Sequence, residues 1–350
     1  MVNGPGRLVA TPEDLNPAEP LFYDSEFLQN QRFHNELALI QLNQRHWAEP
    51  QFLDPLRPLD WRFISEHQGP LVVHGGHTDL DLIWFYGHTL PARLHDTQLG
   101  FQLLRPARVI SYKKLVERFL HVSLDKDSID HSAWLQRPLQ PEQLHYAGAD
   151  VHYLALLYPL LVAELAWHGR LGWWEEEGAD LLAQRRAFWF RWYNLSNAHL
   201  LGNDRPVQVI AHILTEARER LARDWNLLRT RILSDDHIIR IATFGPRTAA
   251  ELLDHLPLRC PLANNQLDFL LDSFAQRKNL EIPPRPNFYL SSDQHGRYLE
   301  LKDYAKGVAK ELNIYPGMLA PESELMRLLL TPEQSSLSRG WRRPFFQQFL

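Results

Sequence analysis

The chain has 350 residues, of which 45% are hydrophobic and 23% charged, so it is long enough for two or three globular domains and is neither disordered nor fibrous. Its formal net charge of −5 argues against a uniformly basic protein that coats a polyanion. The charge is uneven, because residues 1–100 carry a net −7 and residues 101–350 a net +2, which leaves the second part free to form local basic patches.

Residues 20–167 alternate strand-like and helix-like segments, which is typical of an α/β domain. Strands are predicted at residues 20–27, 37–42 and 70–73, and a helix at residues 142–167. The longest apolar stretch of that helix, residues 151–163, is shorter than the roughly 20 residues of a membrane span, so no transmembrane helix and no membrane partner are expected. Residues 1–15 lack the basic start and apolar core of a secretory signal, which favours a cytoplasmic location.

After about residue 170 the strand signals end and helical spacing dominates. Helices are predicted at residues 207–224, 265–278 and 301–312, and Thr248 with Glu251 forms a capping-box pattern that starts another. Prolines clustered at residues 283–286 predict a stiff linker, and the single Cys260 excludes an internal disulfide and an all-cysteine zinc site. We therefore expect two small helical bundles in the C-terminal half.

Asp24 and Glu26 lie two residues apart near the end of the first predicted strand, in the sequence YDSEF. Residues at this spacing project from the same face of a strand, so the two carboxylates lie side by side. They repel each other unless a cation separates them, and hard divalent cations prefer oxygen ligands. The pair predicts a metal site, with solvated strand-end acids as the alternative interpretation.

The predicted helix at residues 142–167 carries Tyr146 and Asp150, in the sequence YAGAD. A spacing of four places the phenol and the carboxylate about 40° apart on one helical face. His145 also precedes Asp150, in a His-x4-Asp arrangement, but lies about 140° away around a regular helix. We therefore expect Tyr146, and not His145, to act beside Asp150.

Asp79 follows the third predicted strand, in a segment that predicts a helix starting near Thr78 as its cap. Its carboxylate then lies in the first turn of that helix and faces the end of the sheet. The alternative interpretation is an acid that only interacts favourably with the helix dipole.

His95-Asp96, with His74 and His77 nearby, imitates the metal-binding dipeptide of HD-domain phosphohydrolases. That fold is all-helical, whereas this region alternates strand, turn and helix. The HD-domain interpretation is therefore disfavoured.

The motifs together resemble, in order and spacing, the ribonuclease D family, which belongs to the tyrosine subgroup of the DEDD exonuclease superfamily. The matching segments cover residues 20–170 and are DSEF, LALIQL, VVHGGHTDL, LHDTQL, SLDK, W-L-x-R-P-L and YAGADVHYL. Two looser matches to helical HRDC domains follow, in ARERLARDWNLLRTRILSDDHIIRIA and in AKELNIYPGMLAPESEL with Gly340-Trp341-Arg342.

The resemblance implies an RNase H-like α/β exonuclease domain, with a mixed sheet flanked by helices, followed by all-α HRDC-like domains. The expected boundaries are residues 1–170 for the exonuclease domain, 171–204 for a helical connector, 205–282 for a first HRDC-like domain and 283–350 for a second.

The resemblance also implies the site residues and the activity. Tyr146 matches the residue that orients the attacking water, and Asp96 matches a recurrent family aspartate outside the metal site, interpreted as a helix cap or strand-end acid. The four residues that match the metal-binding acids, for two Mg²⁺ or Mn²⁺ ions, are Asp24, Glu26, Asp79 and Asp150. The implied activity is metal-dependent 3′ to 5′ exoribonuclease action that releases nucleoside 5′-monophosphates from tRNA precursors and other small structured RNAs.

Two alternatives remain open: a DNA-directed exonuclease of the same superfamily, and an RNA-binding protein that has lost catalysis. The chain also departs from the family pattern at Gln31, at His34-Asn35 and, before Trp134, at Asp130-His131. These departures leave the acids intact and affect the expected contacts with the substrate end.

Lys302, Lys306 and Lys310 recur every four residues on one face of a predicted helix and are candidates for contacts with RNA phosphates. The alternative is a solvated helix face. Trp173 and Trp174 are interpreted as packing anchors at a domain junction, with base stacking as the alternative.

Overall fold

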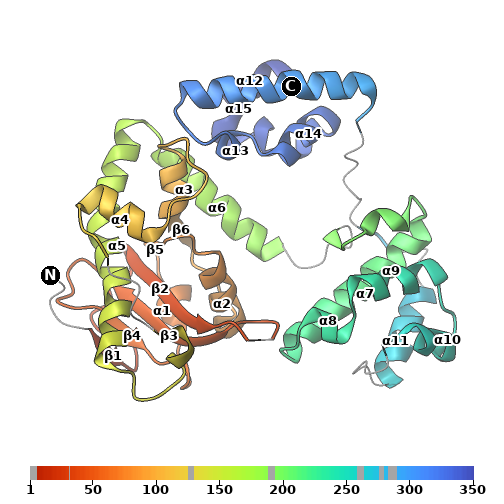
Figure 1. The fold of residues 1–350 in the computed structure, drawn as a ribbon, viewed down its shortest axis with the longest axis horizontal. Coiled ribbons are helices and arrows are strands. Elements are labelled where there is room, and N and C mark those ends of the chain that lie inside the picture. The colour runs from red at the N-terminus through yellow and green to blue at the C-terminus, as the bar shows by residue number, and fades with distance from the viewer. Residues whose placement is uncertain are drawn as a thin grey trace. The chain divides into compact units, whose positions relative to one another are not determined.

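The computed structural model describes residues 6–30, 32–124, 130–187, 194–257, 264–275, 280–282 and 290–350. Gln31, Cys260, part of the SLDK motif and the predicted proline linker at residues 283–286 lie outside the described residues. The chain divides into two compact units (Figure 1). The first comprises Met1–Leu28, Glu36–Ala183 and Asn287–Leu350, and the second comprises Gln29–Asn35 and Gln184–Pro286.

A mixed sheet of six strands forms the centre of the first unit, in the spatial order β1-β4-β3-β2-β5-β6. The strands are β1 (Arg7–Val9), β2 (Leu21–Leu28), β3 (Glu36–Asn43), β4 (Gln51–Leu53), β5 (Pro70–Val73) and β6 (Arg93–Asp96). β2 pairs antiparallel with β3 and parallel with β5, and β5 pairs parallel with β6. The three strands predicted from the sequence are confirmed as β2, β3 and β5, whereas the short strands β1, β4 and β6 are not among the predicted elements.

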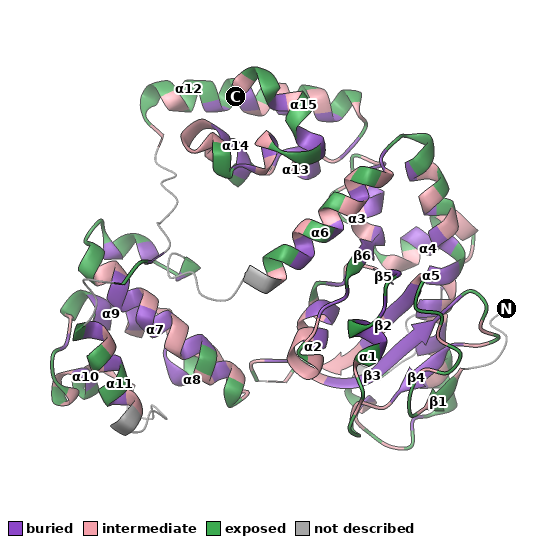
Figure 2. Cartoon of the chain, turned by 180° about the vertical axis from the view of Figure 1, so that it is seen from behind, coloured by how far each residue is buried: buried purple, intermediate pink, exposed green. Residues whose placement is uncertain are grey.

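The central strand β2 separates two hydrophobic cores. Phe22 lies edge to face with Tyr158 of α5 (Pro141–Trp167), at 5.5 Å between ring centroids. Tyr23 belongs to the opposite core, which includes Leu80 of α2 (His77–Gly87). Successive strand residues point to opposite faces, so the side chains of residues 24 and 26 follow Phe22 onto the α5 face, while that of residue 25 follows Tyr23 onto the α2 face. Figure 2 shows the middle of the sheet as buried.

The remaining helices of the sheet region are α1 (Arg62–Ser65), α3 (Thr97–Gln102), α4 (Tyr112–Leu120) and α6 (Leu171–Ala187). Helix α2 begins at His77, with Gly76 and not Thr78 as its cap residue, so the predicted Thr78 cap is wrong. The reason is the tight turn at Gly75, whose φ of 64° lies in the left-handed region and lets the helix start earlier.

Helix α5 is, in the described part of the chain, the one helix long and apolar enough to cross a membrane by length and composition alone. The short apolar stretch noted in the sequence is thus part of a longer apolar helix. However, α5 packs on β2 and β3, and its buried side chains include Val151, Leu154, Leu161 and Leu165. This packing is that of a core helix in an α/β domain.

Residues 290–350 share a hydrophobic core with the sheet region, although the sequence predicts a separate domain there. They form α12 (Ser292–Glu311), α13 (Pro316–Leu319), α14 (Glu322–Leu330) and α15 (Arg343–Phe346). Trp173 on α6 stacks on Trp341 with 4.4 Å between centroids and an interplanar angle of 13°. Trp174 is completely buried. The interpretation of Trp173 and Trp174 as packing anchors is therefore confirmed.

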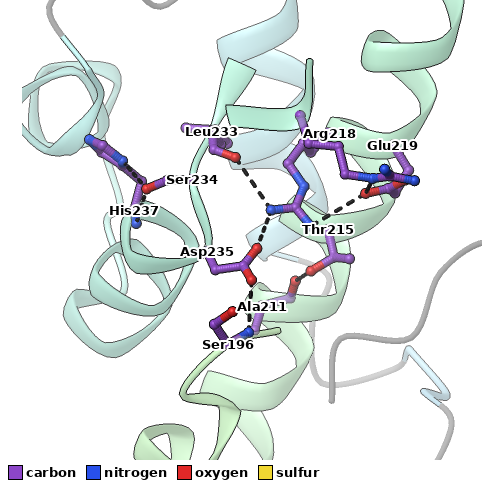
Figure 3. Close-up of polar contacts among 10 residues, drawn as sticks. Ser196, Ala211, Thr215, Arg218, Glu219, Leu233, Ser234, Asp235 and His237 are labelled. Carbon is purple, nitrogen blue, oxygen red and sulfur yellow. Dashed lines mark hydrogen bonds and ion pairs between the residues drawn. The ribbon is translucent and has the colours of Figure 1, made fainter. Parts of the chain in front are cut away.

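The second unit is helical, as expected. It contains α7 (Arg205–Asp224), α8 (Arg229–Ile232), α9 (Asp235–Phe244), α10 (Ala249–His255) and α11 (Asn264–Ala275). Thr248 caps α10 by accepting a hydrogen bond from the Glu251 amide at 3.2 Å. At the centre of the unit, buried Arg218 donates to Leu233 O at 3.3 Å and pairs with Asp235, which also accepts from the Ser196 amide (Figure 3).

Residues 29–35, which connect β2 and β3, belong to this second unit. The Arg229 guanidinium lies 4.4 Å from the centroid of the Phe33 ring, and the His34 amide donates to Asn226 Oδ1 at 3.1 Å. Burial, and then the charges of Arg229 and Arg223, lower the pKa of His34 to about 4. His34, one of the departures from the family pattern, is therefore a neutral packed side chain near pH 7.

Candidate active site

Asp24 and Glu26 of β2 and Asp150 of α5 bring carboxylate oxygens within 4.8 Å of one another. The arrangement follows from the fold, because residues 24 and 26 point to the face of β2 on which α5 packs. Asn43 of β3 donates to Val151 O at 3.4 Å, and Tyr112 of α4 donates to the backbone oxygen of Asp150. These contacts hold α5 against the sheet in the position that places the Asp150 carboxylate beside those of Asp24 and Glu26.

Carboxylates this close repel one another in a partly buried site unless positive charge lies between them. The donor set consists of oxygen atoms alone, which suits hard divalent cations and not the thiolate- or imidazole-preferring metals. The residues present therefore fit a site for divalent ions.

Asp79 lies on the other face of β2, in the first turn of α2. Its carboxylate is buried and accepts a hydrogen bond from the hydroxyl of Ser25, the residue between Asp24 and Glu26. Burial raises the pKa of Asp79 to about 6, and the Ser25 hydrogen bond opposes that rise. The structure thus gathers three of the four predicted acids, and the fourth is joined by a hydrogen bond to Ser25, the residue between two of them.

Tyr146 lies half-buried on α5, with its ring 6.2 Å from that of Trp134. Burial raises the pKa of Tyr146, and the charges of Asp150, Glu26 and Asp24 raise it further. The phenol therefore stays protonated near neutral pH and is able to donate a hydrogen bond. Its neighbour His145 is exposed.

Tyr112 and His74 adjoin this site; sequence reasoning missed Tyr112 and considered His74 only in the HD-domain interpretation. Burial, and then the charges of Asp150 and Asp24, raise the pKa of Tyr112 well above its usual value. The His74 ring lies 5.5 Å from the Tyr112 ring, and its two nitrogens bond Thr97 Oγ1 at 2.9 Å and Ile110 O at 3.0 Å. No motif or spacing marks Tyr112, because it reaches Asp150 only through the packing of α4 on α5.

Among the residues that the structure describes, His74 and His95 do not form a metal site of the HD-domain type. Both His74 nitrogens are engaged as described, and His95 contacts the Tyr158 hydroxyl at 2.8 Å and Glu175 at 2.9 Å. The surrounding fold is α/β. The structure therefore contradicts the HD-domain interpretation.

The three candidate RNA-binding lysines lie on α12. Lys302 forms an ion pair with Glu322, and Lys306 lies 3.0 Å from Asp303. Lys310 is exposed. Their contact with RNA stays a prediction, weakened for the two lysines whose charges are balanced by acids.

Comparisons with known proteins agree with this architecture. A family model for 3′-5′ exonucleases matches residues 3–166, and a model for the HRDC domain matches residues 208–271. Ribonuclease D of Zymomonas mobilis is 28% identical over 99% of this chain and 91% of its own length. Ribonuclease D of Pseudomonas paraeruginosa is 28% identical over 94% of this chain and 90% of its own.

Among solved structures, Escherichia coli RNase D, described as an exoribonuclease involved in structured RNA processing, matches with a TM-score of 0.76 and 23% identity. The match covers 94% of this chain and 91% of that one. At this identity the likeness establishes the fold. The expected fold class, a mixed-sheet exonuclease domain followed by an HRDC helical region, is thereby confirmed.

Proposed function

Since the chain belongs to the ribonuclease D family of DEDD 3′-5′ exonucleases, we propose that it is a metal-dependent exoribonuclease that removes nucleotides one at a time from RNA 3′ ends. The observation that carries the proposal is the group of three carboxylates beside the Tyr146 phenol, inside the segment that matches the exonuclease model. The proposed substrates are tRNA precursors and other small structured RNAs, in the cytoplasm, and the proposed ions are two Mg²⁺ or Mn²⁺.

In this proposal Asp24, Glu26, Asp79 and Asp150 hold the ions. Divalent ions bound there would activate a water molecule and stabilise the charge on the leaving 3′ oxygen. Tyr146 positions that water: because its pKa is raised, the phenol keeps its proton and donates a hydrogen bond without acting as a general base. Tyr112 and Asn43 keep α5 in place, so that the carboxylates and the phenol converge without rearrangement.

The test is incubation of the protein with 3′-labelled tRNA precursor and with a DNA oligomer, in Mg²⁺, Mn²⁺ or chelator. We expect metal-dependent release of mononucleotides from RNA, abolished in Asp24→Asn and retained in Asp60→Asn, an exposed aspartate paired with Arg62. Faster degradation of the DNA oligomer would favour the DNA-directed alternative. RNA binding without release of mononucleotides would favour a protein that has lost catalysis.

A further inference from the structure

Asp96, the last residue of β6, has a buried carboxylate that is engaged entirely by backbone amides. The side chain is 1% exposed. Oδ1 accepts from the amides of Gly75 at 2.9 Å and Gln98 at 2.8 Å, and Oδ2 accepts from Gly76 at 3.1 Å. Hydrogen bonds from N–H groups to an ionised carboxylate are about twice as strong as neutral ones. Asp96 therefore joins the start of α3, which it caps, to the turn that precedes α2.

That turn determines where α2 begins. A Cβ on Gly76 would lie 2.5 Å from Val73 Cγ2, so the backbone passes against the end of β5. The first hydrogen bonds beyond the turn run from the His77 amide to Gly75 O at 2.8 Å and from the Leu80 amide to Gly76 O at 3.0 Å. Asp79 lies inside this first turn, so a shift at residues 75–76 moves its carboxylate.

The backbone of Asp96 is also hydrogen-bonded to a side chain of α6. The Trp174 indole donates through Nε1 to the backbone oxygen of Asp96 at 2.8 Å. The same indole stacks on the His95 ring, with 4.2 Å between centroids. Hydrogen bonds therefore hold both the main chain and the side chain of Asp96, which favours one orientation of its carboxylate.

We propose that Asp96 is a positioning residue of the metal site, which holds the Asp79 carboxylate in place by clamping the Gly75-Gly76 turn. The inference rests on the proposed function, because it takes Asp79 to be a metal ligand. Asp96 is not a ligand itself, since both of its oxygens face backbone amides.

The experiment measures Mn²⁺ binding by electron paramagnetic resonance, without RNA, together with hydrogen exchange of residues 75–80. Asp96→Asn keeps the shape of the side chain but presents an NH₂ group to a backbone amide. Supporting groups of this kind alter metal affinity by about 10- to 100-fold, so we expect Mn²⁺ binding weaker by that factor and faster exchange in the turn. Ser291→Ala is the matched control, because it removes the cap of α12, which accepts from Gln294 at 3.2 Å, away from the acids.

Gly75→Ala is the second variant, and the same Mn²⁺-binding measurement on it tests the inference if Asp96→Asn does not fold. Its Cβ meets no atom closer than 3.6 Å, so it strains the backbone at positive φ without a steric clash. Folded Asp96→Asn and Gly75→Ala proteins that bind Mn²⁺ like the parent chain would overturn the inference and leave the proposed function intact. A parent chain that binds no Mn²⁺, or an Asp24→Asn variant that binds it normally, would overturn both.

Discussion

Arg342 joins the C-terminal helices to α6 through several buried contacts. Its guanidinium donates to Leu319 O at 3.0 Å and to Met318 O at 2.7 Å, pairs with Glu177 of α6, and lies 4.4 Å from the Trp341 ring centroid. The two charged side chains of the pair are only 8% and 12% exposed. Arg342→Ala thus removes the donor to two carbonyl oxygens and the cation paired with a carboxylate, in a buried place.

Breaking a buried ion pair on one side costs about 3 to 5 kcal/mol. Glu177 keeps one donor, the Trp341 indole at 2.7 Å, so we expect the lower value, about 3 kcal/mol in the free energy of unfolding of the first unit. For a unit of this size that loss lowers the melting temperature by roughly 6 to 12 °C.

Urea and thermal unfolding, followed by tryptophan fluorescence, measure this loss. Arg339→Ala is the control, because Arg339 is 69% exposed and lies 3.8 Å from Asp180, so it should cost about 0 to 1 kcal/mol. Equal and small effects of the two variants would refute the view that residues 290–350 complete the core of the sheet region.

Three further outcomes are expected. Tyr146→Phe slows hydrolysis by about 10²-fold with little change in RNA binding, because one oriented hydrogen-bond donor is lost, whereas His145→Ala leaves the rate of hydrolysis unchanged. The reverse ranking in single-turnover assays would contradict the assigned face of α5. The Arg137 hydrogen bond lowers the pKa of Asp54, so the ion pair stabilises the fold above about pH 4. We expect Asp54→Asn to cost about 1.5 to 3 kcal/mol in the free energy of unfolding at pH 7, and this cost to shrink as the pH falls below about 4. A cost that does not change with pH in urea titrations would contradict this role of the ion pair. Lys310→Glu lowers the slope of log affinity against log salt by about one if α12 follows RNA phosphates, and an unchanged slope removes Lys310 from the interface.

Several elements could be predicted from local sequence pattern. β2, β3 and β5 are short, largely buried apolar runs, and α5 repeats buried side chains such as Val151, Leu154 and Tyr158 at helical spacing. Spacing along β2 also places Asp24 and Glu26 on one face, and spacing along α5 places Tyr146 with Asp150, whereas the packing of α5 on β2 brings Asp150 to the other two acids.

The remaining features depend on contacts between distant segments. The start of α2 at His77 depends on a glycine turn clamped by Asp96, 20 or more residues away in the chain, and a local capping rule does not contain that contact. The hydrogen bond between Ser25 and Asp79 joins β2 to α2, and no spacing rule relates the two residues. The placement of residues 290–350 depends on which exposed face of α6 they cover, which helical periodicity alone does not specify.

The integration of residues 287–350 into the first unit has a consequence for biosynthesis. The HRDC helices are translated before those last residues, yet the sheet region needs the last residues to cover Trp173 and the carboxylates of α6. A ribosome-bound chain therefore carries an incomplete nuclease core until residues 287–350 have been made. Termination of translation within residues 290–350 should yield a product that cellular proteases remove, even though all four proposed metal-binding acids have already been made.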